Sequence, residues 1–140
     1  MHRVFYKLLT FCFVLALSLS LARPAHSQST GAQIILLDEL GQPTTSIIDG
    51  DTISLRIELV DPLTNTTQVD FLLSGVDTPI ADCRILTIGR SCESASFSAL
   101  GWYWNPDGTP AHQRTISARL NGQQVIASLN VPVAHVAGPF

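Results

Sequence analysis

The sequence predicts an all-β fold, an antiparallel β-sandwich of about seven strands. Apolar and polar residues alternate with a period of two over several short segments, most clearly over 52–60. Turn-forming dipeptides separate these segments at intervals of about ten residues. No apolar run has the sustained spacing of an amphipathic helix. With 140 residues, the chain is long enough for one domain.

Residues 1–27 have the layout of a secretory signal peptide. A positively charged start precedes an apolar run from Leu8 to Leu21, and Ala25-His26-Ser27 places small residues before a cleavage site at Gln28. The run is shorter than a transmembrane helix of about 20 residues. We therefore expect a secreted or cell-envelope protein whose domain is 28–140, with no membrane span after cleavage. An uncleaved N-terminal anchor is the alternative.

The charge of the expected mature chain argues against nucleic acid as a partner. Residues 28–140 keep five arginines, no lysine and all eleven acidic residues, which is a formal net charge of −6. Such a chain is a poor electrostatic match for DNA, RNA or anionic lipid.

Two cysteines remain after the expected cleavage, Cys83 and Cys92. Export brings a protein into an oxidising compartment, and an even number of cysteines favours a disulfide. The short spacing predicts a local bridge across a hairpin or a single loop. A metal site is the weaker alternative, because no histidine lies nearby.

The strands follow from alternation and from the turns between them. Asp61-Pro62 ends the second strand, Asn105–Gly108 is a turn, and Asn121-Gly122 predicts a tight hairpin between the last two strands. Pro132 falls on the outward phase of the last strand, which suits a sheet edge. A short helix over 93–100 is an alternative for part of the fourth segment. The expected strands are 33–37, 52–60, 68–74, 94–104, 114–120 and 123–133.

Most of the mature chain resembles bacterial immunoglobulin-like modules, which are early-set β-sandwiches. The resemblance implies an immunoglobulin-like sandwich and a bacterial origin. The cysteines are too close in sequence to be the inter-sheet pair of antibody domains. The segments that carry the likeness are Gly50–Thr52, Val69–Gly75, Gly101–Trp104, Asn105–Gly108, Arg114–Ala118 and Val131–Val133.

Two shorter segments resemble the thermonuclease family, Ile48–Thr52 and Gly75–Pro79. This resemblance implies an OB-type barrel as the alternative fold, with calcium carboxylates at Asp51 and Asp77. Two groups that the family's phosphodiester chemistry needs are absent, because Ile80 stands at the glutamate position and Leu72 at the first arginine position. The family reading therefore implies an inactive or repurposed relative.

Three aspartates are candidate calcium ligands, because carboxylates on loops suit a hard cation. They are Asp49, Asp51 and Asp77. The alternative is that Asp49-Gly50-Asp51 is a solvated turn before a strand. No other cofactor is expected.

Three consecutive aromatic residues are candidates for ligand binding, Trp102, Tyr103 and Trp104. They would form a platform for sugar rings if they faced solvent. In an alternating strand, however, Trp102 and Trp104 share one face, most simply the core face with Leu100. Tyr103 is then the exposed member.

The remaining histidines and arginines suggest no catalytic site. His112 and His135 lie far apart in sequence without a serine or cysteine nucleophile, and we expect solvated loop histidines. Arg114 and Arg119 flank a strand and are expected to face solvent.

The function that the sequence favours is a non-enzymatic binding or structural module, secreted or at the cell surface. We expect it to recognise a protein or glycan partner through loops or through the edge strand 125–133. A calcium-binding relative of thermonucleases and a carbohydrate-binding module are the alternatives.

Overall fold

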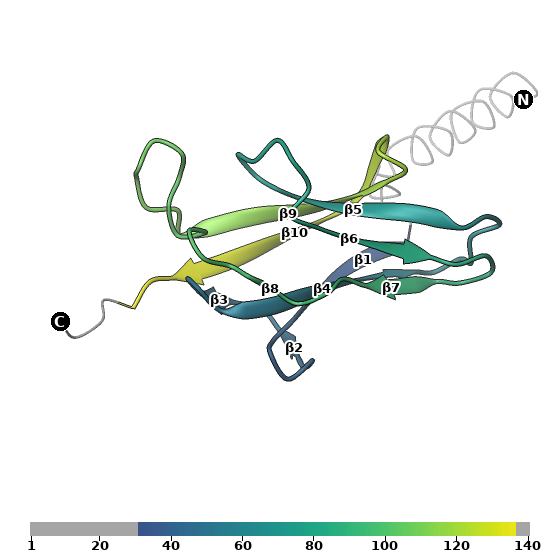
Figure 1. Cartoon of the computed structure of the whole chain (residues 1–140), viewed down its shortest axis with the longest axis horizontal. Coiled ribbons are helices and arrows are strands. Elements are labelled where there is room, and N and C mark those ends of the chain that lie inside the picture. The colour runs from purple at the N-terminus through teal and green to yellow at the C-terminus, as the bar shows by residue number, and fades with distance from the viewer. Residues whose placement is uncertain (1–30, 137–140) are drawn as a thin grey trace, which may run out of the picture.

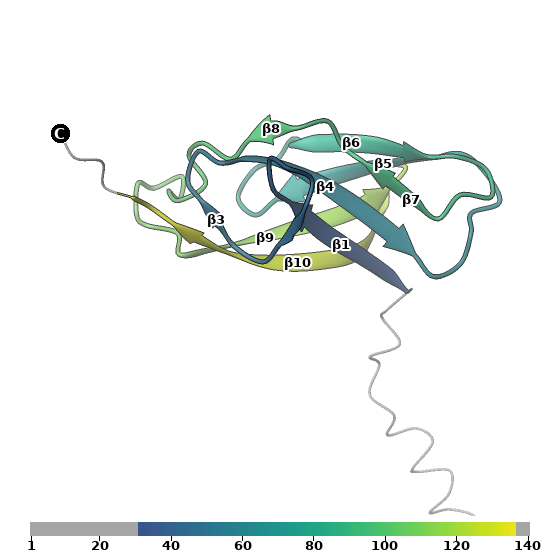
Figure 2. The same ribbon diagram turned by 90° about the horizontal axis from the view of Figure 1, so that it is seen from below.

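The computed structural model describes residues 31–136, and its regular structure is entirely β-strand (Figure 1). Ten strands form two sheets that pack face to face (Figures 1 and 2). The predicted all-β sandwich is confirmed. Within 31–136 no helix is long and apolar enough to cross a membrane. The expected signal peptide, 1–27, and its cleavage site lie outside the described residues.

Each sheet contains five strands. The first has the spatial order β2 (Pro43–Thr44), β1 (Ala32–Leu37), β4 (Thr52–Leu59) and β7 (Ser91–Glu93), and β8 (Phe97–Ser98) also pairs with β4. The second has the order β3 (Ile47–Ile48), β10 (Gln124–Ala134), β9 (Gln113–Leu120), β5 (Thr67–Leu73) and β6 (Ala81–Ile85).

One strand pair differs from the antiparallel prediction. The chain passes from β2 in the first sheet to β3 in the second, and β3 then runs parallel to β10, with Ile47 opposite Val133 and Ile48 opposite Ala134. The rest of β10, expected as the sheet edge, pairs only with β9.

The core lies between the sheets and follows from the alternation in sequence. Ile53, Leu55 and Ile57 of β4 face inward and are buried, and Phe71 and Ile116 meet them from the second sheet. Burial of a side chain of this kind stabilises the fold by about 1.5–3 kcal/mol. The pattern that predicted these strands is thus the pattern that fills the core.

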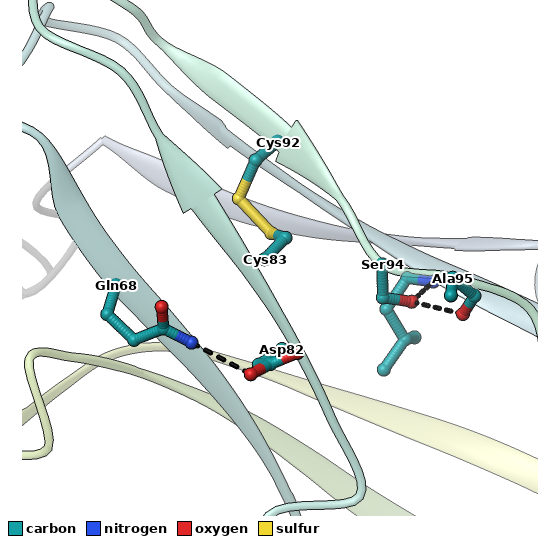
Figure 3. Close-up of a disulfide and its surroundings, with 7 residues drawn as sticks. Gln68, Asp82, Cys83, Cys92, Ser94 and Ala95 are labelled. Carbon is teal, nitrogen blue, oxygen red and sulfur yellow. Dashed lines mark hydrogen bonds between the residues drawn. A yellow bond between two sulfur atoms is a disulfide. The ribbon is translucent and has the colours of Figure 1, made fainter.

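The disulfide joins the two sheets and closes the single loop between β6 and β7 (Figure 3). Cys83 lies on β6 and Cys92 on β7, which are the edge strands on one side of the sandwich, and their Cα atoms are 5.8 Å apart. The expected pairing is confirmed, and the bridge closes a single loop as expected, because only residues 86–90 separate β6 from β7. The alternative of a hairpin is wrong, since β6 and β7 are not paired with each other. The short link between β6 and β7 crosses from one sheet to the other, so a pair close in sequence can still be an inter-sheet bridge.

The predicted strand over 94–104 is largely wrong. Only Phe97–Ser98 forms a strand, and the chain then turns at Gly101, whose φ is 86°. Over 101–112 the strand pairing is limited to one isolated β-bridge, between Trp104 and Pro110. A turn does not place alternate residues on one face, so the argument from alternation fails here.

Candidate functional site

Four rings and one carboxylate gather at the end of the sandwich where β10 finishes. We call this group the ring cluster: Asp49, Tyr103, Trp104, His112 and His135. Asp49 comes from the turn between β3 and β4, and His135 directly follows β10. The other three lie between β8 and β9. The fold thus brings together residues from three distant segments.

Tyr103 is the centre of the ring cluster. Its ring stacks on His135 with 5.0 Å between centroids and an interplanar angle of 18°. Trp104 and His112 meet Tyr103 edge-on, at centroid distances of 5.0 and 5.6 Å. Trp104 also contacts His135 in a T-shaped arrangement at 5.7 Å. Such edge-to-face and offset contacts are the favourable geometries for aromatic pairs.

The carboxylate of Asp49 contacts both residues of the stacked pair, Tyr103 and His135. Its side chain is only 8% exposed, and Oδ2 lies 3.9 Å from Nδ1 of His135. The backbone N–H of Tyr103 donates to Oδ1 at 3.3 Å. The N–H of Asp49 in turn donates to the carbonyl of Ala134 at 2.8 Å. Asp49 therefore links the stacked pair through its carboxylate and the end of β10 through its backbone N–H.

The loop between β8 and β9 is closed on itself. The N–H of Ala111 donates to the carbonyl of Tyr103 at 2.5 Å, and the N–H of Asn105 to the carbonyl of Thr109 at 2.8 Å. These bonds bring His112 back beside Tyr103. The ring cluster is consequently held by backbone pairing as well as by ring contacts.

The exposed ring is not the one that alternation predicted. Trp102 is buried, as expected. Trp104, expected in the core, is 43% exposed, and Leu100, expected beside it, is exposed as well. Tyr103, expected at the surface, is half-buried against the core. The cause is the turn at Gly101, which rotates the two residues away from the predicted faces.

Arg114 supports the ring cluster from within the sandwich. Contrary to expectation it is buried, and its Nη1 donates to the carbonyls of Trp102 and Trp104 at 3.3 and 3.0 Å. Its Nη2 donates to the carbonyl of Ser74 at 2.5 Å. Burial lowers the pKa of the guanidinium, because the charged form loses water. The Nε atom has no hydrogen-bond partner in the part of the chain described.

Arg119 also departs from the expectation of a free surface side chain. It is partly buried on the outer face of the second sheet, where Nη2 lies 3.8 Å from Oδ2 of Asp70. That position is remote in the sheet register from the end that carries the ring cluster, because Arg119 is paired opposite Asp70 in the middle of β5.

The three candidate calcium ligands do not form a common site. Asp49 faces His135 and Tyr103, whereas Oδ2 of Asp51 accepts a hydrogen bond from the N–H of Ile48 at 2.8 Å. Asp77 is exposed on the loop between β5 and β6. Over 31–136, no group of three or more His, Cys, Asp or Glu side chains is placed to hold a metal ion.

Sequence reasoning missed the two histidines of the cluster. His112 and His135 are indeed exposed, but they meet across Tyr103 instead of standing apart. Nothing in their spacing signals this, since the contact depends on the loop after β8 and on the register of β10.

Comparison with known proteins adds no assignment: no family model matches the chain, and no curated protein is detectably similar to it.

Proposed function

We propose that the protein is a non-enzymatic, immunoglobulin-like binding module that acts in a secreted or cell-envelope location. The strand order supports the class, since β1, β4 and β7 share one sheet and β5, β9 and β10 the other. This is the division of strands A, B, E and C, F, G in immunoglobulin-like sandwiches. The Cys83–Cys92 disulfide supports an oxidising location.

We propose further that the ring cluster is the ligand-binding surface and that its ligand is a carbohydrate. The observation that carries this is the exposure of Trp104 beside two exposed histidines over a buried carboxylate. An exposed indole offers an apolar face to a sugar ring, and the imidazoles offer hydrogen bonds to its hydroxyls. Tyr103 has a positioning role beneath them, because His135 already covers its ring.

The test is retention of the exported, oxidised chain on cellulose, chitin and peptidoglycan. Trp104→Ala is expected to reduce retention on the polysaccharide that binds by about tenfold or more, in the range of one stacked aromatic contact. Leu40→Ala is the matched control, because Leu40 is 84% exposed and lies on the turn between β1 and β2.

Two outcomes would count against the carbohydrate assignment. One is equal retention of the wild type and Trp104→Ala. The other is no retention on any of the three polysaccharides together with Trp104-dependent capture of a protein from the native envelope. The second outcome would mean that the ring cluster is a binding surface for a protein and not for a carbohydrate, since tryptophan is also enriched at protein hot spots.

A further inference from the structure

The end of the sandwich opposite the ring cluster is formed by two loops that lie side by side, 60–66 and 86–90 (Figures 1 and 2). The N–H of Leu63 donates to the carbonyl of Gly89 at 3.1 Å, and the N–H of Ile88 to the carbonyl of Leu63 at 2.8 Å. The chain also enters the described domain here, because the N–H of Val60 donates to the carbonyl of Gly31 at 2.8 Å.

Three aliphatic side chains project from this end. Val60, Leu86 and Ile88 are 65, 66 and 82% exposed. Leu40 and Leu100 are exposed to a similar degree elsewhere, but at this end three such side chains occur on two loops that are hydrogen-bonded to each other. Leaving such side chains in water forgoes the stabilisation that their burial would give.

The turn that presents Ile88 is fixed and conformationally costly. Ile88 has a φ of 61°, a left-handed conformation that a β-branched residue rarely adopts. The N–H of Gly89 closes the turn on the carbonyl of Leu86 at 2.8 Å. A Cβ on Gly89 would lie 2.8 Å from that same oxygen, so only glycine fits. A strained residue that is held outward points to a role in contact.

Two exposed arginines flank the same turn, Arg84 and Arg90. Their guanidinium groups make no ion pair or hydrogen bond within the described residues. The loops carry one acidic residue, Asp61. The other arginines of the described chain are engaged: Arg56 with Glu58 and Glu93, Arg114 with three carbonyls and Arg119 with Asp70.

We infer that this end docks on an anionic lipid surface. Leu86 and Ile88 would enter the boundary between headgroups and acyl chains, while Arg84 and Arg90 would contact lipid phosphates. Aliphatic tips flanked by cations match the layered polarity of that interface. The overall acidity of the chain opposes long-range attraction to such a surface, so the attraction must come from Arg84 and Arg90 in direct contact with lipid phosphates.

The place where residues 1–30 join the domain supports the same orientation. Gly31, where the described chain begins, accepts a hydrogen bond from Val60 at this end, and the predicted apolar run Leu8–Leu21 precedes it in the sequence. If that run is kept as an anchor, it holds this end near the bilayer. If it is cleaved, docking depends on the two loops alone.

The test is sedimentation of the exported chain with vesicles of phosphatidylcholine, with and without phosphatidylglycerol. Binding is expected only with the anionic lipid. Arg84→Gln/Arg90→Gln should weaken it about thirtyfold, at roughly 1 kcal/mol for each arginine. Leu86→Ser/Ile88→Ser should weaken it by about tenfold or more. Leu40→Ser is the control, and every variant keeps the same N-terminal segment, so its contribution cancels.

Orientation is read from fluorescence with brominated lipids. The native tryptophans, Trp102 and Trp104, lie at the far end and should not be quenched, whereas a Leu86→Trp variant should be. Equal vesicle binding by the wild type and both double variants would overturn the inference. So would the absence of vesicle binding with an Ile88-dependent dimer in sedimentation velocity, which would assign this end to a second copy. Trp104→Ala should leave vesicle binding unchanged, so this test is independent of the carbohydrate proposal.

Discussion

Arg114 joins three backbone carbonyls that no other side chain of the described domain reaches. We expect Arg114→Met to lower the free energy of unfolding by about 2–4 kcal/mol, because it keeps the apolar stem and removes these hydrogen bonds. Urea denaturation measures the change. Arg84→Met is the matched control, because Arg84 is exposed, and its effect should stay within about 0.5 kcal/mol. Equal stability of the two variants would contradict the structural role of Arg114.

Asp107 gives the turn between β8 and β9 a pH-dependent element. Oδ1 accepts hydrogen bonds from Thr109 Oγ1 at 2.6 Å and from the Thr109 N–H at 2.9 Å. The hydroxyl bond, followed by the backbone bond, lowers the pKa of Asp107 below its ordinary 3.8. The folded state thus favours the carboxylate, and its contribution is present above the unfolded pKa and is lost as the pH falls through the folded one.

The expected result is that Asp107→Ala lowers Tm at about pH 7 and that the difference from the wild type shrinks at about pH 2. The expected change in Tm is small, because the carboxylate is exposed to solvent. Thermal unfolding followed by circular dichroism at both pH values checks it. A difference that persists unchanged in acid would assign the effect to something other than the ionised carboxylate.

At the level of single residues, the sequence predicted the buried Trp102 but not the exposed Trp104. Side-chain direction could be inferred only by assuming a strand, and the assumption failed where Gly101 adopts a positive φ. The burial of Arg114 was equally out of reach. Its partners are carbonyls, and carbonyl positions depend on loops that the local sequence does not specify.

The disulfide holds the edge strands of the two sheets together at one side. Replacing both cysteines by alanine should lower the free energy of unfolding by about 2–3 kcal/mol, because closing a loop with a sequence separation of 9 restricts the unfolded chain. Urea denaturation of the oxidised wild type and of the double variant measures this. A reductant should destabilise the wild type by the same amount and leave the double variant unaffected. Equal midpoints for all three would show that core packing alone holds β6 and β7.

At the level of elements, alternation predicted β4, β5, β9 and β10 well, because each has one face in the core and one toward solvent. It missed β6 and β7, which are short edge strands beside the disulfide. Edge strands bury less of each side chain, so their pattern is weak. The parallel β3–β10 pair was missed because two residues carry no period.

The whole molecule should not respond to calcium. Its three candidate aspartates form no common metal-binding group within the described residues, so millimolar calcium should leave Tm unchanged in both the wild type and Asp51→Asn, relative to chelator. Binding at a hundredfold excess over the dissociation constant would instead stabilise the fold by about 2.7 kcal/mol and raise Tm by several degrees. A rise that Asp51→Asn abolishes would contradict the structure and favour the calcium-binding alternative.

The fold class could be predicted from sequence because a two-layer sandwich requires only alternation and turns. The ring cluster could not, since its members come from the β3–β4 turn, the segment after β8 and the end of β10. Their meeting depends on how the sheets are stacked and on the register of β10 against β9. A site of this kind is a property of the tertiary structure.

The placement of the described chain ends has a mechanical consequence. The start of β1 and the end of β10 lie at opposite ends of the sandwich (Figures 1 and 2). A pull between them runs along the strands, so β1 would have to slide past β4 against six residue pairs, and β10 past β9 against eight. Hydrogen bonds between two strands that are pulled along their length must break together. Hydrogen bonds between strands that are pulled apart from one end break one at a time. Along this axis the domain is therefore expected to resist a larger force than it would across its strands.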